Sequence, residues 1–218
     1  MSSSNAPDIS RAHIVPLLDT PFLRVFDLQY AEGRHYYNAT RRPLENLVAP
    51  MSGEDFRRMA PDAVTCIVIL RLPDQEPRLL LSREYRYPAG RFLLSPPAGL
   101  LDPEDRSAPE PALSAALREI QEETGSTAAP AVLRLVSPLV FSSPGMTDES
   151  NAFLCAEITL DNLDDLNQNG AEGSELFNGF ELLDRKQAQE IFRTGRDKHG
   201  NFYSLAAWMV LSIFLSQF

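Results

Sequence analysis

The segment Arg118–Gly125, with the sequence REIQEETG, constrains this chain more than any other stretch of it. If the segment is helical, Glu119, Glu122 and Glu123 stand at positions i, i+3 and i+4 and share one face of the helix. Such a face is often no more than a solvated acidic surface. However, three carboxylates so close together repel one another, and Mg²⁺ prefers oxygen ligands of this kind, often shared with substrate phosphates. The spacing therefore allows two interpretations, a metal-binding helix or a solvated acidic face.

The residues before this segment predict where the helix begins and which side faces the core. Ser107 with Glu110 three residues later fits a capping box, and Pro109 suits the first turn. Gly125 supplies the C-terminal stop. The inward stripe is expected to consist of Leu113, Leu117, Ile120 and Thr124. By the rotation of 100° per residue, the acidic face then lies roughly 140° from the centre of that stripe.

The remaining chain combines strand-like and helix-like stretches without strict alternation. Strands are expected over residues 22–29, 34–42, 63–70, 78–85, 92–94, 132–136 and 152–159. Further helices are expected over residues 184–194 and 204–215, after a polar stretch at 161–178. This order predicts an α/β (α+β) fold, a sandwich around a mixed sheet with a small N-terminal β-hairpin. We expect an N-terminal β region over residues 1–60 and the main domain over residues 61–218.

Charge and cysteine content narrow the class of protein. The chain has 218 residues and a net charge of −10, with no basic stripe, which argues against nucleic acid as a partner. An anionic substrate would then need metal ions that neutralise its site locally. Cys66 and Cys155 lie in apolar runs and are expected to be buried, reduced thiols. With no signal-like start and no apolar run long enough to span a bilayer, we expect a cytoplasmic protein without a membrane partner.

The acidic helix resembles the sequence box of the Nudix hydrolase family, G-x5-E-x7-R-E-U-x-E-E-x-G-U, where U is a bulky apolar residue. Glu110, seven intervening residues and REIQEETG reproduce its second half, and Gly99 in PPAGLLD supplies the opening glycine. Two departures are evident. Ten residues instead of five separate Gly99 from Glu110, and Ser126 stands at the final apolar position. We expect the insertion to lengthen the loop before the helix without moving the carboxylates.

The resemblance implies a Nudix-type α/β/α sandwich and a role for each matching residue. Glu119 and Glu123 would be the main Mg²⁺ ligands, Glu122 would assist, and the carbonyl of Ala98 would add a backbone oxygen; Mn²⁺ could substitute for Mg²⁺. Arg118 would orient the glutamates through charge-assisted hydrogen bonds. The first acidic residue of the box, Glu110, would be structural. The ions would polarise a pyrophosphate and lower the pKa of the attacking water.

Two stretches of the main domain are similar to the ADP-ribose pyrophosphatase branch of the family. The run REYR at residues 83–86 resembles the strand that leads to the box, where the arginine matching Arg86 contacts the substrate. The run SPGMTDE at residues 143–149 resembles the SPG loop of that branch, although Pro144 lies slightly farther from the box than usual. The resemblance therefore extends beyond the box itself.

The N-terminal part is similar to the same branch. Arg42 ends a strand as the second of two arginines, and in the branch this arginine reaches the substrate. An upstream aromatic residue of the branch stacks on adenine, and Phe22 is the best match, with Tyr36 or Tyr37 as alternatives. Exchanged N-terminal sheets occur in the branch, so the resemblance also implies a homodimer.

The general base remains open at the level of sequence. In this branch a glutamate from a loop after the SPG strand takes the role, and the segment NQNGAEGSELFNG offers Glu172 and Glu175 in the matching place. We favour Glu175. Alternatively, Glu119 or Glu122 acts as base from the helix itself, since a carboxylate near the attacking water is reasonable in either location.

The leading functional hypothesis is Mg²⁺-dependent hydrolysis of a nucleoside diphosphate sugar, with ADP-ribose cleaved to AMP and ribose 5-phosphate. An alternative is another sugar nucleotide, of the GDP-mannose or UDP-glucose type, because the box reads the pyrophosphate and not the base. A third hypothesis is a nucleotide-sensing Nudix domain without catalysis. The sequence does not decide the base, the sugar, the number of metal ions or the physiological role.

Overall fold

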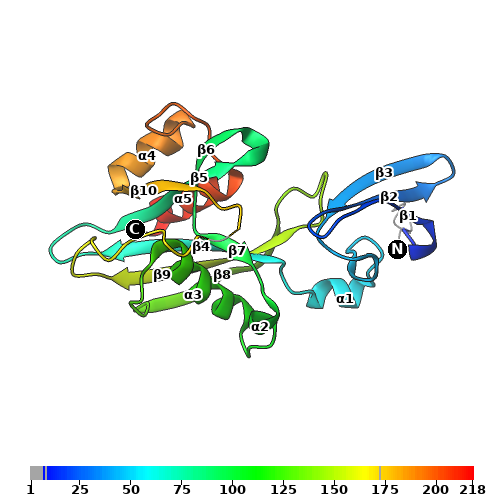
Figure 1. The fold of residues 1–218 in the computed structure, drawn as a ribbon, viewed down its shortest axis with the longest axis horizontal. Coiled ribbons are helices and arrows are strands. Elements are labelled where there is room, and N and C mark those ends of the chain that lie inside the picture. Colours follow the sequence, from blue (N-terminus) through cyan, green and yellow to red (C-terminus); the bar gives the residue numbers. More distant parts are fainter. Residues whose placement is uncertain (1–6, 8, 172) are drawn as a thin grey trace. The chain divides into compact units, whose positions relative to one another are not determined.

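The fold is described from a computed structural model that covers residues 7, 9–171 and 173–218 (Figure 1). The chain divides into two compact units. Met1–Pro61 and Val140–Ser150 form the first unit, and Asp62–Leu139 and Asn151–Phe218 form the second. No helix within the described residues is long and apolar enough to cross a membrane.

The first unit contains a three-stranded antiparallel sheet with the order β1-β2-β3. Its elements are η1 (Arg11–His13), β1 (Ile14–Asp19), β2 (Arg24–Ala31), β3 (Arg34–Thr40), η2 (Leu44–Asn46) and α1 (Gly53–Arg58). Glu32 and Gly33 form the predicted turn, and Gly33 has a φ of 64°, which glycine adopts without strain. A small core of Ile14, Phe26, Leu28 and Leu47 packs beneath the sheet.

The second unit is built on a seven-stranded mixed sheet with the order β10-β5-β4-β9-β8, to which β6 and β7 add by pairing with β5 and β4. The strands are β4 (Ala63–Arg71), β5 (Arg78–Arg86), β6 (Arg91–Ser95), β7 (Ala98–Leu100), β8 (Val132–Phe141), β9 (Ser150–Thr159) and β10 (Phe177–Leu183). The central strands β4 and β9 are parallel, whereas β4 and β5 are antiparallel. The remaining elements are η3 (Tyr87–Ala89), α2 (Pro103–Arg106), α3 (Pro111–Thr124), α4 (Arg185–Thr194) and α5 (Leu205–Gln217).

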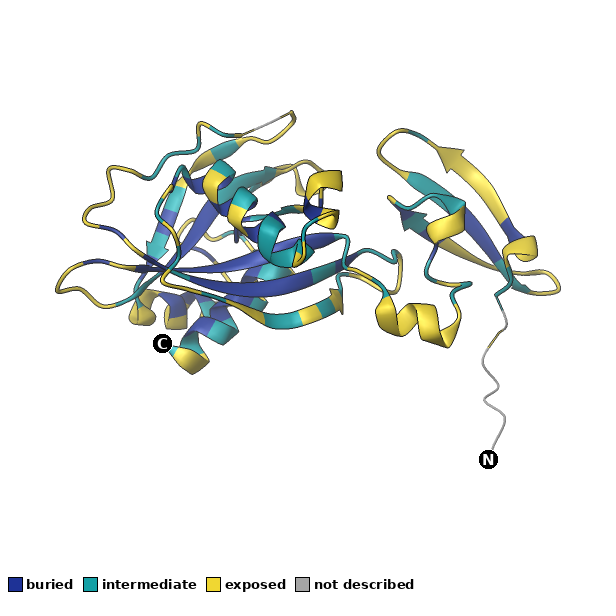
Figure 2. Ribbon diagram, turned by 90° about the horizontal axis from the view of Figure 1, so that it is seen from below, coloured by how far each residue is buried: buried dark blue, intermediate teal, exposed yellow. Residues whose placement is uncertain are grey.

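Both faces of this sheet are covered by helices (Figures 1 and 2). Side chains alternate across a strand, and β4 follows this rule. Val64 and Val68 of β4 join the core under α3, whereas Ile67 and Ile69 join the core under α4 and α5. The expected α/β/α sandwich around a mixed sheet is confirmed. The two cysteines are buried and unbridged.

Several elements differ from the expectation. Ser107 ends α2 and donates its hydroxyl to the carbonyl of Pro103, so it does not cap the acidic helix, which begins at Pro111. The segment between Gly99 and the acidic helix contains the end of β7 and the helix α2. Strands β1 and β10 and helix α1 were not expected. Phe22 lies in the loop before β2 and not in a strand.

Candidate active site

Helix α3 lies close to the sheet because small side chains make the contact. Ala115 and Ala116 are fully buried in the core shared with β4, together with Ile120. Leu117, which was expected to face inward, is 44% exposed. The alanines, and not the leucine stripe, therefore set the orientation of the helix.

This orientation buries two of the three glutamates. Glu119 is 5% exposed and Glu123 is 4% exposed, whereas the Glu122 side chain is partly exposed. An isolated carboxylate loses favourable hydration on burial, so the neutral form gains stability. Accordingly, burial raises the pKa of Glu119 to about 7, although the charge of Arg118 opposes the shift. Burial likewise raises the pKa of Glu123 well above its ordinary value.

The carboxylate of Glu123 is only half satisfied. Its Oε1 accepts a hydrogen bond of 2.9 Å from the backbone N–H of Ala98 in β7. Its Oε2 is buried and makes no hydrogen bond to any of the described residues. A buried acceptor without a partner costs about 1–3 kcal/mol. A bound cation would give Oε2 of Glu123 the partner that it lacks.

Gly99 leaves the space that the carboxylate of Glu119 occupies. A Cβ at this position would overlap all three atoms of that carboxylate. The strand β7 therefore contacts both glutamates. The backbone N–H of Ala98 donates a hydrogen bond to Glu123, and Gly99, which has no side chain, leaves room for the carboxylate of Glu119. Glu119 can therefore occupy this position only because residue 99 has no side chain.

Arg118 bonds to two of the glutamates that follow it on the helix. Its Nη1 lies 2.8 Å from Oε1 of Glu119 and donates a hydrogen bond of 2.8 Å to Oε2 of Glu122. Charge-assisted bonds of this kind are stronger than neutral ones and fix the planar guanidinium relative to its partners. The arginine consequently holds both carboxylates on the same side of the helix.

The donor set fits a hard divalent cation. As the side chains stand, no three His, Cys, Asp or Glu residues of the described chain form a ready-made metal cage. However, the glutamates offer only oxygen donors, Oε2 of Glu123 has no partner, and Gly99 forms a cradle for Glu119. Mg²⁺ is bound through such carboxylates in company with water and phosphate oxygens. The residues therefore suit a divalent cation that takes its remaining oxygen ligands from elsewhere.

Comparison with known proteins agrees with this geometry. Residues 59–204 match the NUDIX domain family. The chain belongs to the Nudix family. It is 39% identical over 80 residues to a nudix hydrolase of Caenorhabditis elegans, 33% over 100 residues to the ADP-ribose pyrophosphatase of Saccharomyces cerevisiae and 37% over 87 residues to the ADP-sugar pyrophosphatase of Mus musculus.

These segments cover 37%, 45% and 40% of this chain, and they span only 33%, 40% and 36% of the length of the three relatives. A crystal structure described as an ADP compounds hydrolase resembles the fold with a TM-score of 0.57. The likeness covers 99% of this chain and 97% of that one, at 15% sequence identity. This comparison supports the Nudix fold alone.

The acidic residue that holds the Nudix arginine was not identified from the sequence, where Glu110 was expected to be structural. Glu110 precedes α3 and is exposed, and its side chain makes no capping hydrogen bond to the helix. Instead, Asp105 of α2 accepts hydrogen bonds from Nε and Nη2 of Arg118, at 3.2 and 2.9 Å. The sequence offered a signal, because Asp105 and not Glu110 lies at the box distance of five intervening residues from Gly99.

Glu84 is a second residue that the sequence analysis missed. Alternation along β5 places Leu80 in the core on the α3 side and Leu79 and Leu81 in the opposite core, so Glu84 faces the side of the Nudix helix. Burial raises the pKa of Glu84, and its charge contributes to the raised pKa of Glu123. The same period-two pattern in REYR could have identified it.

Arg86 lies on the same side of β5 and pairs with this new carboxylate. Its Nη2 is 2.5 Å from Oε2 of Glu84, and its guanidinium contacts the hydroxyl of Ser95 at 3.4 Å. The arginine that was predicted to contact substrate is thus held beside the acidic cluster by a residue of its own strand.

Glu175 stands at the approach to β10. The backbone N–H of Tyr85 donates to the carbonyl of Leu176 at 2.8 Å, and Phe177 pairs with Glu84. The charge of Glu175 contributes to the raised pKa values of Glu84, Glu119 and Glu123. Of the two candidate bases in this segment, Glu172 lies outside the described residues.

The predicted substrate contacts Phe22 and Arg42 belong to the first unit. Phe22 is 79% exposed in the loop between β1 and β2. Arg42 follows β3 and donates from Nη1 to the carbonyl of Asn46 at 3.5 Å. In the same unit the hydroxyl of Tyr36 donates to the carbonyl of Gly145 in the SPG loop at 2.7 Å.

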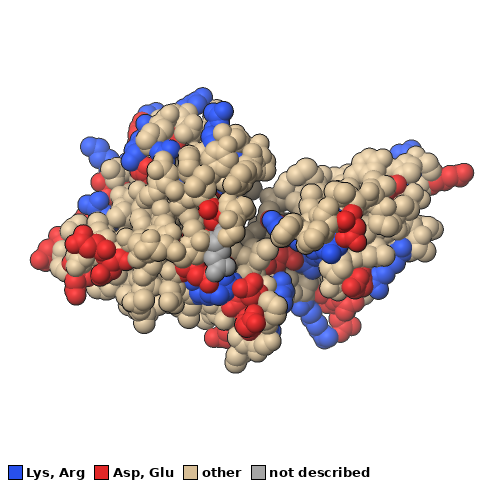
Figure 3. All heavy atoms as spheres, in the orientation of Figure 1, with Lys and Arg blue, Asp and Glu red and all other residues tan. Residues whose placement is uncertain are grey.

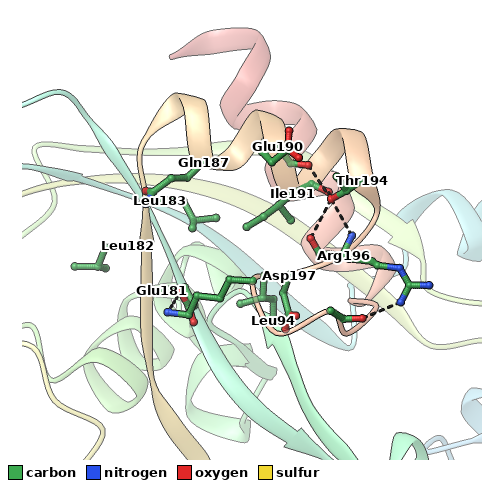
Figure 4. Close-up of a pocket in the computed structure, with 12 residues that line it drawn as sticks. Leu94, Glu181, Leu182, Leu183, Gln187, Glu190, Ile191, Thr194, Arg196 and Asp197 are labelled. Atoms are coloured by element: carbon green, nitrogen blue, oxygen red, sulfur yellow. Dashed lines mark hydrogen bonds and ion pairs between the residues drawn. The ribbon is translucent and has the colours of Figure 1, made fainter.

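A cavity of about 570 Å³ lies between β10 and α4 in the second unit (Figure 4). Leu94, Leu183 and Ile191 line its apolar part. At its rim the carboxylate of Glu181 is neutralised by Lys198, whose Nζ lies 2.7 Å from Oε2. None of the predicted site residues lines this cavity.

Proposed function

We propose that this Nudix protein is a divalent-cation-dependent hydrolase of the pyrophosphate bond in a nucleoside diphosphate sugar. The observation that carries the proposal is the buried pair Glu119 and Glu123, with one oxygen of Glu123 left without a partner. The names of the yeast and mouse relatives favour ADP-ribose, cleaved to AMP and ribose 5-phosphate. We propose Mg²⁺ as the cation, with Mn²⁺ as a substitute.

The charge distribution supports a small anionic substrate over a nucleic acid. The net charge is −10, and the basic side chains on the face drawn in Figure 3 are scattered among acidic ones. A protein that binds nucleic acid commonly presents a basic stripe to the phosphates. A cation at the glutamates would instead supply positive charge only at the pyrophosphate.

In this proposal Glu119, Glu123, Glu122 and the carbonyl of Ala98 hold the cation. When bound, the cation offsets negative charge on the pyrophosphate and acidifies a nearby water. Arg118 keeps Glu119 and Glu122 in position through Nη1. These residues therefore position and stabilise charge, which is the main task in phosphoryl chemistry.

The further roles are proposed in the same way. Glu175 accepts a proton from the attacking water, with Glu119 or Glu122 as the alternative base. Arg86 and Arg42 bind substrate phosphates or sugar, and Phe22 stacks on the base. The charge of Glu175 raises the pKa of both Glu84 and Glu119, which supports the first of these assignments.

The cation site is tested with Glu119→Gln and Glu123→Gln. Turnover of ADP-ribose, GDP-mannose and UDP-glucose is measured with Mg²⁺, Mn²⁺ and EDTA, and Glu76→Gln in an exposed loop serves as control. We expect ADP-ribose turnover that EDTA abolishes and that each site variant lowers by at least about 100-fold. Folded site variants with full activity would disprove the proposal. Tight binding of ADP-ribose by the wild type without any turnover would favour a nucleotide sensor.

The general base is tested separately with Glu175→Gln and Glu172→Gln. If Glu175 is the base, its variant loses about 10²–10⁴-fold in kcat while Mn²⁺ affinity stays unchanged, because the residue is not a ligand. Glu172→Gln should retain activity. A loss of less than about tenfold in both variants would assign the base to the helix.

We also propose that the N-terminal β region, residues 1–60, pairs two chains into a homodimer, and that residues 61–218 form the Nudix domain. The three-stranded sheet leaves Leu17 and Leu18 of β1 and Tyr37 of β3 exposed, and exposed apolar surface is often part of an interface. Size-exclusion chromatography with light scattering should show a dimer for the wild type and a monomer for Leu17→Glu. A wild-type monomer at micromolar concentration would contradict the proposal.

A further inference from the structure

Asp105 lies in α2, between Gly99 and the acidic helix, and its carboxylate is buried with hydrogen bonds to both oxygens. It is 3% exposed. Its Oδ1 accepts a hydrogen bond of 2.8 Å from the hydroxyl of Ser114 on α3. Its Oδ2 accepts bonds from the backbone N–H of Asp102 at 3.1 Å and from Arg118. The carboxylate therefore joins α2 to α3.

The electrostatic balance shows that Asp105 stays charged. Burial alone would raise its pKa, but the hydrogen bonds from Arg118 and Ser114 outweigh burial, and the pKa lies below the ordinary value. A charged carboxylate with bonds to both of its oxygens makes a rigid anchor, because each bond restricts the position of the group. The anchored carboxylate binds the guanidinium of Arg118.

Arg118 divides its donors between two sets of acceptors. Nε and Nη2 bind Asp105, and Nη2 also donates to the carbonyl of Leu100 at 2.8 Å. On its other side, Nη1 lies 2.8 Å from Oε1 of Glu119 and donates a hydrogen bond to Oε2 of Glu122. Since the guanidinium is planar and rigid, fixing the edge that carries Nε and Nη2 also fixes the position of Nη1.

The insertion explains why this residue was overlooked. Five residues separate Gly99 from Asp105, and twelve separate Asp105 from Arg118. The additional residues thus follow Asp105 instead of preceding it, and α2 turns the chain back so that Asp105 reaches the arginine. Seven residues separate Glu110 from Arg118, as in the box, but its side chain is exposed and makes no capping hydrogen bond to the helix.

We propose that Asp105 is a positioning residue of the cation site: it fixes the guanidinium of Arg118 so that Glu119 and Glu122 are held ready to bind the ion, and Glu110 has no part in this. The inference rests on the proposed cation-dependent function. Groups that orient metal ligands from behind typically contribute about 10–100-fold to metal affinity or activity.

The test compares Asp105→Asn with Glu110→Gln, since each replaces one acid by its amide. Mn²⁺ binding is measured by calorimetry on the folded proteins, and kcat and KM for ADP-ribose are measured beside it. We expect Asp105→Asn to weaken Mn²⁺ binding by about tenfold or more and to lower kcat more than it raises KM. Glu110→Gln should stay within twofold of the wild type, and Asp105→Glu should recover part of the affinity because it restores the charge.

A double-variant cycle shows whether Asp105 acts through the arginine. In an Arg118→Lys background, Asp105→Asn should cost little further Mn²⁺ affinity, whereas independent effects would add. If Asp105→Asn does not fold, Ser114→Ala loosens the same carboxylate and should weaken Mn²⁺ binding by a smaller factor. Unchanged Mn²⁺ affinity in a folded Asp105→Asn, or in Ser114→Ala when the first variant does not fold, would overturn the inference. Failure of the proposed hydrolysis is a separate outcome, in which the wild type binds Mn²⁺ but turns over none of the nucleotides.

Discussion

At the scale of single residues, the space above Gly99 determines where the carboxylate of Glu119 can lie. We predict that Gly99→Ala leaves the fold nearly intact, because the added Cβ meets the end of a flexible side chain and not backbone. The displaced Glu119 should then lose its place at the cation site, with Mn²⁺ affinity and kcat falling about 10–100-fold. Calorimetry and a thermal melt measure the two effects separately.

Gly53→Ala is the matched control for this variant. Gly53 begins α1, and its added Cβ would meet only Arg57 at an ordinary distance of 3.5 Å. It should change neither Mn²⁺ affinity nor kcat. A Gly99→Ala protein that binds Mn²⁺ as the wild type does would show that Glu119 does not depend on this cradle.

The same scale shows what the sequence could and could not reveal about the site. Helix geometry alone places Glu119, Glu122 and Glu123 on one face, so their grouping was predictable. The direction of that face was not, because Ala115 and Ala116, and not Leu117, make the contact with the sheet. Whether small or large residues of a helix face the core depends on how closely its partner approaches, which is a property of the packed structure.

At the scale of elements, the polar segment between β9 and β10 packs directly on the end of α3. A Cβ on Gly170 would overlap the backbone of Glu122, which cannot move without the helix. The backbone N–H of Asn167 donates to the carbonyl of Thr124 at 2.9 Å, and the Gln168 amide donates to Ser82 at 3.3 Å. The segment that leads to Glu175 is therefore positioned by contacts with α3 and β5.

From this contact we predict that Gly170→Ala displaces the segment. Since the obstacle is backbone, the melting temperature should fall by several degrees, in line with the about 1–3 kcal/mol typical of overpacking. If Glu175 is the base, kcat should fall more than Mn²⁺ affinity, because the ligands belong to α3. Thermal melts and calorimetry test this, again beside Gly53→Ala. A Gly170→Ala protein with unchanged stability would contradict the tight contact.

Two strands that the sequence did not predict, β1 and β10, are both irregular. In β10 the register shifts between Phe177 and Phe180, and Gly179 there has a φ of 79°, so a bulge interrupts the alternation by which strands are recognised. In β1 the register shifts after Pro16, which cannot donate to the ladder. By contrast, the uninterrupted apolar run of β4 was predicted almost to its ends. Sequence patterns thus revealed the regular strands and not those whose regularity is broken.

At the scale of the whole molecule, the buried glutamates couple folding to pH and to the cation. In the folded protein burial raises the pKa of Glu119 to about 7, and burial also raises the pKa of Glu123 well above its ordinary value of 4.5. The folded state therefore keeps protons that the unfolded chain has already released above pH 4.5. The stability that these protons provide is complete below that pH and is lost as the pH rises towards 7. Asp27 and Asp105 have lowered pKa values and contribute fully above 3.8, so they do not alter the trend at higher pH.

We therefore predict that, in EDTA, the melting temperature falls between pH 5.5 and pH 8. A divalent cation binds the ionised carboxylates, so Mg²⁺ should stabilise the protein more at pH 8 than at pH 5.5. The variant Glu119→Gln cannot ionise at this position, and its melting temperature in EDTA should depend less on pH than that of the wild type. Scanning calorimetry at the two pH values, with EDTA and with excess Mg²⁺, measures all four conditions. Equal stabilisation by Mg²⁺ at both pH values would mean that the ion does not compete with protons for these carboxylates, and the cation site would then have to lie elsewhere.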